Sequence, residues 1–386
     1  MVLHETCSGG KTIAISSYFK PDVLPVAPLI RVSPSKFQLF RDCRLRACLE
    51  SNRFPRLLPR SPSARCGTVI HRIIEAAAKR RINEEDDFEE CWNRYIMIEE
   101  KEMVDSWIER HLVPLKKSTA KYELKKYQCL LAIKNVFNKT RSHVAYDLIN
   151  RISNEIWLET QDKIVGGLVD AIISTNTGDI IIDYKTGSIT KLNRNYESVQ
   201  EIYKIQLQLY AAIYNSAFGI WPISLQIAGI DGTSYEIDFD QKDCTSLLNE
   251  AYHIVTEINS MIADKKNLSE INDLLSSPSP ETCRYCLYRP ACKSYFEMKK
   301  ISTTAEWPRD IIGSLYEKKI LGNGLMLIRV VASNNNSDII TMRGLHPGRH
   351  PALNFESNKI AIFSMVSDNS PNNFKEGILT TIYIVS

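Results

Sequence analysis

Two apolar runs separated by a short polar segment constrain the fold of this chain most strongly. Ile164–Ser174 and Ile180–Tyr184 are rich in Ile and Val, and residues 176–179, Asn-Thr-Gly-Asp, favour a turn. The pattern predicts two strands joined as a hairpin. Asp170 lies within the first predicted strand and Asp183 lies near the end of the second. A carboxylate is costly to bury unless it is paired or binds a metal, so a polar site is expected on this hairpin.

Lys185 follows Asp183 by two residues and completes a group of charged side chains. Two carboxylates can hold Mg²⁺ or Mn²⁺ near a phosphate group. A neighbouring ammonium can steady a nucleophile or stabilise the charge that develops during phosphodiester hydrolysis. The same residues also fit a solvated hairpin whose acids face water, and both alternatives stay open on these three residues alone.

Further polar residues occur in a definite order around the predicted hairpin. Gly67 and His71 form a G-x-x-x-H motif at the start of a predicted helix, and Glu155 precedes the first strand. Gln206 and Tyr210 lie in the segment YKIQLQLYAAIY after the second strand. They are four residues apart, so both fall on one face of a predicted helix and can point into the same cleft.

The order of these motifs resembles the RecB-like branch of the PD-(D/E)XK nucleases. The quoted motifs are G-x-x-x-H, Glu155, G-x-x-D from Gly167 to Asp170, D-Y-K-T-G from Asp183 to Gly187, and Q-L-x-L-Y-A from Gln206 to Ala211. The resemblance implies an α/β fold with a restriction-endonuclease-like core. It implies Mg²⁺ or Mn²⁺ held by His71, Asp170, Asp183 and the main-chain carbonyl of Tyr184. The catalytic residues that it implies are Asp170, Asp183, Lys185, Glu155, Gln206 and Tyr210.

Each of these residues has an expected role under the resemblance. Lys185 would orient the attacking water and stabilise the pentavalent phosphate. Glu155 would lie close to the site without holding the metal directly. Gln206 and Tyr210 would contact the DNA backbone or the metal-bound water. A polar stripe on a surface helix is the alternative interpretation of the last two residues.

Four of the ten cysteines form a second, independent pattern. Cys43 stands alone, whereas Cys283, Cys286 and Cys292 form C-x2-C-x5-C. The first thirty residues lack a basic start followed by an apolar core, so a signal peptide is not expected and the protein is expected in the cytoplasm. Clustered thiols in a reducing compartment indicate a metal rather than disulfides. Four thiolates can hold either zinc or a [4Fe–4S] cluster.

One distant cysteine followed by C-x2-C-x5-C resembles the iron–sulfur clasp of RecB-like exonucleases, which include the CRISPR-associated family and the AddB-type subunits. The resemblance implies a [4Fe–4S] cluster with the ligands Cys43, Cys283, Cys286 and Cys292. Ser33–Cys43 has the serine-led form of the first helix in that family. Arg44 stands where the family often has proline, so Cys48 remains an alternative fourth ligand.

Charge is unevenly distributed, although the net charge is only +3. From Arg41 to Arg81 there are eleven Lys or Arg residues and three Asp or Glu residues. An acidic run at 84–90 follows and masks this excess in the total. A phosphate-contacting surface is expected here, with a solvated helix face as the alternative. The candidate nucleic-acid-binding residues in this segment are Arg44, Arg46, Arg53 and Arg56.

The chain of 386 residues divides into two expected domains. Residues 1–300 would form the RecB-like nuclease domain, with a helical insertion at about 82–150 and the clasp made by Cys43 and residues 283–292. Residues 301–386 would form a small, OB-like β-barrel, because short strand-like runs alternate with turns. Arg343 and Arg349 are candidate nucleic-acid contacts on this module. A dimerisation or docking role is the alternative.

The patterns together predict a metal-dependent DNA nuclease. Exonucleolytic action on single-stranded DNA or DNA ends, in repair or antiviral defence, is the expected activity. A catalytically silent DNA-binding iron–sulfur scaffold subunit and a zinc-dependent nucleic-acid binder stay open as alternatives. The run Ser8–Thr12 lacks the first glycine of a P-loop, so a separate helicase or operon partner would supply any unwinding. No apolar stretch is long enough to predict a membrane partner.

Overall fold

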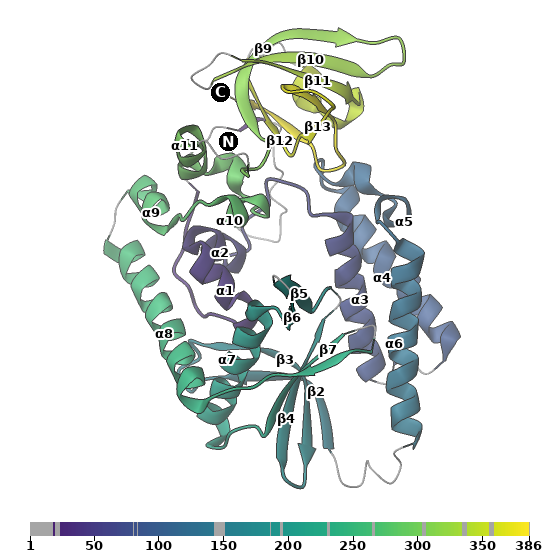
Figure 1. The fold of residues 1–386 in the computed structure, drawn as a ribbon, viewed down its shortest axis with the longest axis vertical. Helices are drawn as coiled ribbons and strands as arrows, with labels where there is room; N and C mark the ends of the chain where they lie inside the picture. The colour runs from purple at the N-terminus through teal and green to yellow at the C-terminus, as the bar shows by residue number, and fades with distance from the viewer. Residues whose placement is uncertain are drawn as a thin grey trace, which may run out of the picture.

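The computed structural model describes most of the chain, and Figure 1 shows a lower α/β body beneath a curled C-terminal sheet. The described residues are 18–19, 24–79, 81–82, 84–142, 151–185, 187–193, 196–229, 232–264, 267–302, 306–333, 338–354 and 359–385. The P-loop-like run at 8–12 lies outside these ranges. Among the described residues, no helix has the length and apolar character needed to cross a membrane.

A five-stranded sheet in the order β2-β3-β4-β7-β8 carries the predicted hairpin. Its strands are β2 (Arg151–Glu159), β3 (Gly166–Thr175), β4 (Gly178–Lys185), β7 (Ser224–Gly229) and β8 (Ser234–Glu236). The antiparallel pairing of β3 with β4 confirms the hairpin, with Thr175 opposite Gly178 beside the turn. Gly178 has a φ of 143°, and a Cβ there would meet Ile223 at 2.4 Å, so only glycine fits.

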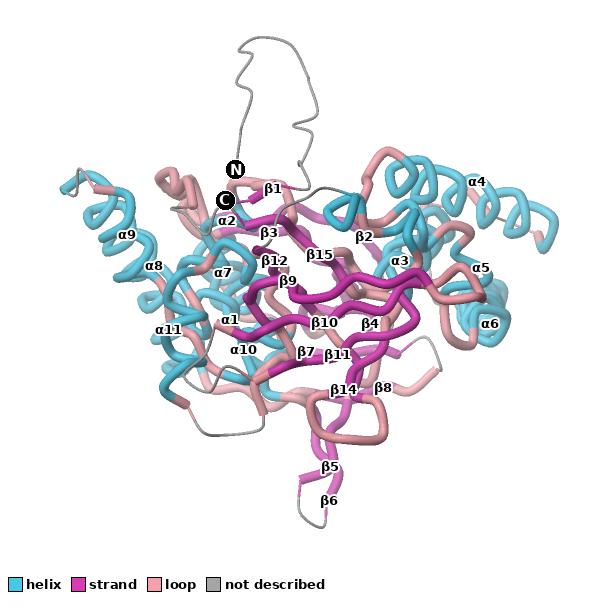
Figure 2. Tube along the Cα trace, turned by 90° about the horizontal axis from the view of Figure 1, so that it is seen from above, coloured by secondary structure: helices cyan, strands magenta, loops and turns pink. Residues whose placement is uncertain are grey.

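Strands β4 and β7 are parallel, so the chain must cross over between them. The crossover contains β5 (Thr190–Asn193), β6 (Tyr196–Val199) and α7 (Glu201–Phe218). Figure 2 shows β5 and β6 projecting from the body as a small hairpin. Helix α7 ends at Gly219, whose φ of 74° suits the left-handed cap of a helix. It packs against the sheet on one side and against α1 (Pro34–Asp42) and α8 (Gln241–Asp264) on the other.

The helices on the right of Figure 1 have a core of their own. They are α3 (Pro62–Ala78), α4 (Glu85–Val104), η1 (Arg110–Leu112), α5 (Leu115–Ser118) and α6 (Tyr122–Ser142). Ser61 caps α3 by accepting a hydrogen bond from the Ala64 amide at 3.2 Å. In the core, Trp92 donates its indole N–H to the Tyr122 hydroxyl at 2.8 Å. Helices α4 to α6 fall within the range where the insertion was expected.

A set of short helices lies between the lower sheet and the C-terminal sheet in Figure 1. They are α2 (Arg44–Ser51), α9 (Leu268–Leu275), α10 (Pro280–Arg284), η2 (Arg289–Ala291) and α11 (Lys293–Ile301). Two segments far apart in sequence meet here, because the amides of Leu57 and Leu58 both donate to the Leu287 carbonyl at 3.1 Å. The expected clasp cysteines lie on these elements or at their ends.

The C-terminal sheet curls into a half-barrel. Seven of its strands are β9 (Ile311–Ile320), β10 (Met326–Ala332), β11 (Ile339–Leu345), β12 (Lys359–Phe363), β13 (Val366–Ser367), β14 (Asn373–Lys375) and β15 (Thr381–Val385). The short strand β1 (Tyr18–Phe19) adds to β15 at one edge. The helical turns η3 (Pro347–Arg349) and η4 (Pro351–Asn354) follow β11.

This topology corrects the expectation of an OB-like barrel. The strand order is β1-β15-β12-β9-β10-β11-β14-β13, and within the described residues no pairing joins β1 to β13. The sheet is therefore open and has eight strands, whereas an OB-fold is a partly open barrel of five strands. The second half of β9, YEKKI, is charged and exposed rather than apolar, so it does not resemble the short apolar runs that predict strands in this region.

The C-terminal sheet packs directly onto the lower body. Phe363 and Tyr383 from the sheet share a buried cluster with Leu58 and the partly buried Trp107. The Tyr383 hydroxyl donates to the Leu57 carbonyl at 2.5 Å, and its ring meets Trp107 edge-on at 5.4 Å. A buried tyrosine usually finds a hydrogen-bond partner, and here that partner joins the last strand to the first third of the chain.

Candidate active site

The hairpin brings the two predicted acids together at the end away from its turn, just beyond the pair formed by Ala171 and Ile182. Asp170 lies on β3, and Asp183 lies on β4. The Tyr184 amide donates to Oδ2 of Asp170 at 2.7 Å, so the carboxylate of one strand is tied to the backbone beside the second carboxylate. Because the pairing register fixes these positions, the strands bring together residues that are thirteen apart in sequence.

Asp183, Lys185 and Gln206 form a closed triangle of polar contacts. The Lys185 ammonium lies 2.6 Å from Oδ2 of Asp183 and donates to Oε1 of Gln206 at 2.9 Å. The Gln206 amide nitrogen donates to Oδ1 of Asp183 at 2.7 Å. Gln206 of helix α7 is therefore hydrogen-bonded to two residues at the end of β4. The sequence-predicted lysine and glutamine are both in direct contact with the acid.

The burial of the Asp183 carboxylate and the free lone pairs of its Oδ2 atom suit the binding of a cation. The residue is 6% exposed, and its Oδ2 atom is buried with no hydrogen bond beyond the Lys185 ion pair among the described atoms. A buried carboxylate needs a nearby positive charge, which Lys185 supplies here. The free lone pairs of a hard oxygen fit Mg²⁺ or Mn²⁺.

Tyr203 is a residue of this site that the sequence did not single out. The Lys185 ammonium lies 4.8 Å from the centre of the Tyr203 ring, within the range of a cation–π contact. Tyr203 precedes Gln206 by three residues and Tyr210 by seven, which puts all three on one face of α7. That spacing was the available signal.

His71 lies on α3, near enough to Lys185 and Asp183 for both charges to act on its pKa. Its surroundings lower the pKa of the imidazole, chiefly by desolvation, then through the positive charge of Lys185, with Asp183 opposing. The two charges act on His71 because all three side chains are near one another. A lowered pKa keeps the ring neutral at pH 7, which is the form that binds a metal. The ring also remains open to solvent.

Tyr210 orients the strand rather than reaching into solvent. It is 2% exposed, and its hydroxyl donates to the Leu168 carbonyl of β3 at 2.7 Å. A Cβ at Gly167 would lie 3.0 Å from the Tyr210 oxygen and 3.0 Å from Cδ of Pro34. The glycine of the G-x-x-D motif therefore lets α1 and α7 approach β3 closely, three residues before Asp170 on the same strand.

The other described side chains do not complete the predicted metal site. Glu155 lies on β2, but its side chain is outside the described residues. Over the described part of the chain, no three His, Cys, Asp or Glu side chains are grouped closely enough to hold a metal ion as they stand. The structure thus brings Asp170, Asp183 and Lys185 together, with His71 near enough for their charges to act on it, and these described side chains do not form a complete coordination sphere.

The four predicted clasp cysteines line one small cavity. Cys43 lies between α1 and α2, and Cys283, Cys286 and Cys292 lie on or beside α10 and α11. Burial raises the pKa of Cys283 to about 12 and that of Cys286 to about 11, so these thiols are protonated at neutral pH. A metal would deprotonate such thiols on binding. The four thiols therefore share one cavity, but among the described residues they are not grouped closely enough to hold a metal ion as they stand.

Cys48 lies close to this group but does not line the cavity. It is fully buried on α2, and burial followed by the nearby Cys43 raises its pKa to about 12. None of the nine cysteines that the structure describes forms a disulfide. The geometry therefore groups Cys43, rather than Cys48, with the three later cysteines.

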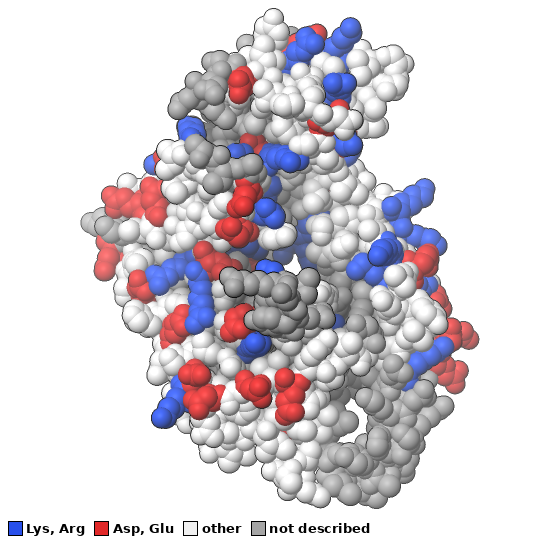
Figure 3. All heavy atoms as spheres, viewed as in Figure 1, with Lys and Arg blue, Asp and Glu red and all other residues white. Residues whose placement is uncertain are grey.

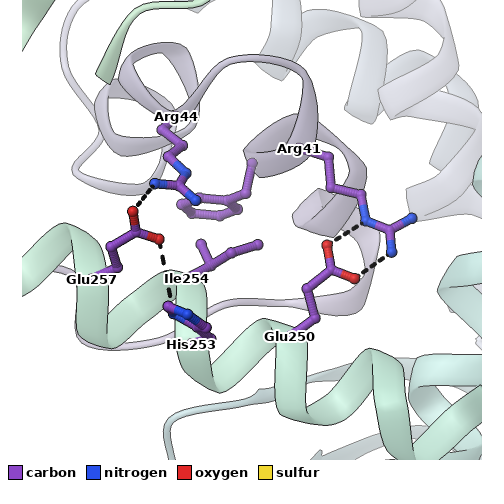
Figure 4. A pocket seen from close by; sticks show the side chains of 7 residues that line it. Arg41, Arg44, Glu250, His253, Ile254 and Glu257 are labelled. Atoms are coloured by element: carbon purple, nitrogen blue, oxygen red, sulfur yellow. Dashed lines mark hydrogen bonds and ion pairs between the residues drawn. The ribbon is translucent and has the colours of Figure 1, made fainter. Parts of the chain in front are cut away.

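The predicted basic segment is partly neutralised by acids. Arg44 pairs with Glu257 of α8 at 2.9 Å, and Arg41 pairs with Glu250, as Figure 4 shows around a pocket between α1 and α8. Arg46 pairs with Glu50 at 3.1 Å and lines the cysteine cavity. Of the other candidate contacts, Arg53, Arg56 and Arg343 are exposed, whereas Arg349 is half-buried against Glu376 at 2.8 Å.

The face of the molecule seen in Figure 3 is hollowed near its centre. Lys and Arg side chains appear inside this hollow and again below and over the C-terminal sheet. Acidic side chains lie along the left and right margins of the same face, and also beside the hollow and below it. The Lys and Arg side chains within the hollow attract anions there.

Comparison with known proteins matches these observations to a family. The family model of the PD-(D/E)XK nuclease superfamily matches residues 31–293, which is more than half of the chain. The crystal structure of SSO0001 is similar at 15% identity with a TM-score of 0.26, over 58% of this chain and 96% of that one. No match was found among curated proteins. The chain carries the hairpin acids and lysine inside the matched range, and it belongs to the PD-(D/E)XK nuclease superfamily.

Proposed function

We propose that this protein is a divalent-metal-dependent deoxyribonuclease of the RecB-like branch. The observation that carries the proposal is the contact of Lys185 and Gln206 with Asp183, beside the backbone-tied Asp170. A purely structural hairpin has no need to bury a carboxylate and a lysine together, because such a pair rarely stabilises a fold. A site that must bind a cation and a phosphate has that need.

The proposed metal ligands are His71, Asp170, Asp183 and the main-chain carbonyl of Tyr184. A bound Mg²⁺ or Mn²⁺ would polarise the phosphodiester and lower the pKa of a water molecule. His71 would present a neutral ring nitrogen, since its pKa is lowered. Glu155 is proposed to lie near the site, on the strand that pairs with the Asp170 strand.

The side chains of α7 hold the lysine ready for this chemistry. Gln206 and Tyr203 contact the Lys185 ammonium from two directions, so its position is restricted before substrate arrives. Preorganised charge stabilises a transition state without a cost of reorganisation. Lys185 is proposed to orient the attacking water and to stabilise the phosphate, while Tyr210 holds β3 in register.

Cleavage of a labelled single-stranded oligonucleotide tests this proposal. The wild-type protein should cleave it with Mg²⁺ or Mn²⁺ and stop when EDTA removes the metal. Lys185→Met should lose activity by about a hundredfold or more, since a charge acting on the transition state is removed. Lys242→Met, at an exposed lysine of α8, serves as the control and should retain full activity. Equal activity of wild type and Lys185→Met would refute the assigned role.

We also propose that Cys43, Cys283, Cys286 and Cys292 hold a [4Fe–4S] cluster. Its support is the single cavity that the four thiols line. Anaerobically purified protein should be brown and contain iron and sulfide, and Cys286→Ser should lose both. Cys244→Ser, at a buried cysteine of α8, should keep them. A colourless protein with stoichiometric zinc would overturn the iron–sulfur assignment, and loss of iron only in Cys48→Ser would replace Cys43 as the ligand.

We further propose exonucleolytic action on single-stranded DNA or DNA ends, in repair or antiviral defence. The support is the basic hollow on the face shown in Figure 3. A separate helicase or operon partner would supply single strands from duplex DNA. Digestion of linear and circular single strands compares the two modes directly, because an exonuclease requires an end and leaves the circular substrate intact.

A further inference from the structure

The C-terminal sheet has two faces that the pairing register separates. Alternate residues of β12 and β15 point to opposite sides, and Ala361 pairs with Tyr383 on the side that packs against the lower body. Ile360 and Ile382 belong to the other side, where the half-barrel has its own core. The side containing Ala361 is called the body-facing side below.

The body-facing side continues across β9, β10, β11 and β14 beyond the contact with the lower body. Ile312 belongs to it, and the pairs that follow are Ser314 with Val331, Glu317 with Arg329, and Lys319 with Leu327. Across the next strands, Arg329 pairs with Thr341, which in turn pairs with Asn373. The core residues of β10 and β11 alternate with these positions, which confirms the assignment of sides.

The charges on this extension are unbalanced. On its strands the acidic residue is Glu317, which pairs with Arg329 at 2.6 Å, and Asp368 lies opposite Asn373 at the edge next to β14. The basic residues on these strands are Lys319, Arg329, Arg343 and Lys375. Four positive charges against two negative charges leave an excess of two among the described residues of this surface. The residues between them include the partly or fully exposed apolar side chains Leu327, Val331 and Ile339.

Arg343 and Lys375 are direct register partners on the neighbouring strands β11 and β14, and both are exposed. Adjacent strands lie about 4.8 Å apart, and like charges placed directly opposite each other destabilise a sheet. Among the described residues, the Arg343 guanidinium has a long contact of 3.5 Å to the Asn373 amide oxygen. A sequence selected for stability alone would favour an acid at one of these positions, because opposite charges attract across strands. Two neighbouring positive charges are instead suited to binding an anion such as a phosphate.

Arg349 and His350, which lie in the loop after β11, do not belong to this surface. Arg349 pairs with Glu376 at 2.8 Å, contacts His111 of η1 at 2.9 Å, and donates to the Ile378 carbonyl at 3.1 Å. His350 is 1% exposed and contacts Glu376 at 2.7 Å. These contacts engage both residues and hold the sheet against the helical part of the molecule.

We propose that the body-facing extension of the C-terminal sheet, centred on Arg343 and Lys375, binds the phosphates of single-stranded DNA. The proposal rests on the proposed nuclease function, because it describes how that enzyme holds its substrate away from the scissile bond. Cations complement phosphates, and the intervening apolar side chains can contact unstacked bases. A duplex hides its bases and offers nothing to those apolar residues.

Binding of a labelled single-stranded oligonucleotide in EDTA, measured by fluorescence anisotropy at several salt concentrations, tests the proposal. Arg343→Gln with Lys375→Gln removes two phosphate contacts. Affinity at 0.1 M salt should fall by about 20-fold, and the slope of log affinity against log salt should decrease by about 1.4. The matched control is Lys163→Gln with Lys242→Gln, two exposed lysines away from this sheet, and it should bind as wild type.

Thermal unfolding of the same double variant separates binding from folding. Removal of the repulsive pair should leave the melting temperature unchanged or raise it, so weaker binding cannot then result from misfolding. Unchanged affinity and salt slope in a folded double variant would overturn the proposal. So would a loss of binding to polyglutamate with no loss of binding to DNA, since that result identifies an acidic protein as the ligand.

The result of the binding experiment does not depend on whether the protein is a nuclease. Cleavage of an oligonucleotide of a few nucleotides, which is too short to span from the hairpin site to this sheet, should be equal in wild type and double variant. If neither protein cleaves, the proposed function fails while the anisotropy result still stands. If both cleave equally and DNA binding is also equal, the binding surface alone is refuted.

Discussion

At the scale of single residues, Gln206 shows how helix α7 positions Asp183 on β4. Its amide accepts from Lys185 and donates to Asp183, so one side chain restricts the direction of both charged groups. Tyr203 and Tyr210 occupy the same helix face and contact the lysine and strand β3. The face of α7 was visible in the sequence spacing. The partner of each residue was not, because spacing gives no distance between separate elements.

Gln206→Leu should reduce cleavage while leaving substrate affinity nearly unchanged. The variant removes the hydrogen bond to a buried carboxylate, which costs about 1–3 kcal/mol when the acceptor is left without a partner. Lys185 would also lose one of its supports, so kcat should fall more than KM rises. The comparison is with Gln208→Leu two residues away, whose amide makes only a long contact of 3.4 Å to Asp238. Equal kcat in both variants would contradict a positioning role for Gln206.

Gly167 and Gly187 should respond differently to the same small change. A Cβ at Gly167 meets Pro34 and the Tyr210 hydroxyl at 3.0 Å, whereas one at Gly187 meets nothing within 4 Å. Gly167→Ala should therefore lower the free energy of unfolding by about 1–3 kcal/mol through overpacking, and Gly187→Ala should have little effect. Chemical denaturation measures both. A neutral Gly167→Ala would show that close packing is not the reason for this glycine.

At the scale of elements, the predicted hairpin was confirmed because its signal is local. Two apolar runs and a turn are enough to define β3 and β4, and the register then fixes which residues meet. Strand β9 lacks such a local signal in its outer half, which carries charge and gains its stability from neighbours on both sides. The expected barrel was wrong for a related reason, since closure depends on pairings between distant strands.

The short helices near the cysteines are joined to the C-terminal sheet by one buried acid. Asp310 accepts from Arg289 at 2.5 Å, from the Tyr295 hydroxyl at 2.8 Å and from the Ser364 amide at 2.7 Å. Burial would raise the pKa of Asp310, but the Arg289 guanidinium, with Lys299, holds it below its usual range. Arg289 and Tyr295 also line the cysteine cavity, so this network connects the cavity to the sheet.

Asp310→Asn should destabilise the protein by about 3–5 kcal/mol, because it leaves the buried Arg289 charge without its partner. The wild-type acid has a lowered pKa, so its contribution is present above the pKa of the unfolded chain and is lost as pH falls through the folded value. The variant should therefore lose stability less steeply in acid. Denaturant unfolding between pH 7 and pH 3 measures both effects, with the exposed Asp243→Asn as control. Identical stability of the Asp310 variant and wild type would contradict this account.

At the scale of the whole molecule, three parts meet around the central hollow. The lower sheet carries the acids, α3 brings His71 from the helical part, and the C-terminal sheet is fastened above by Tyr383 and Arg349. The contacts of Tyr383 with Leu57 and of Arg349 with His111 join residues more than two hundred positions apart, and sequence patterns alone cannot predict them. The chemistry of the hairpin could be predicted, because its acids, lysine and turn are close in sequence.

The cleavage rate of Asp183→Asn, measured on a labelled single strand with saturating Mg²⁺ or Mn²⁺, tests the metal-dependent nuclease assignment most directly. The amide keeps the shape of the side chain but removes the charge that a metal ligand and the Lys185 ion pair both require. The rate should fall by about a thousandfold or more, while single-strand affinity in EDTA stays close to that of wild type. Asp238→Asn, at an exposed acid, should cleave normally. Cleavage by Asp183→Asn at the wild-type rate would contradict the assignment.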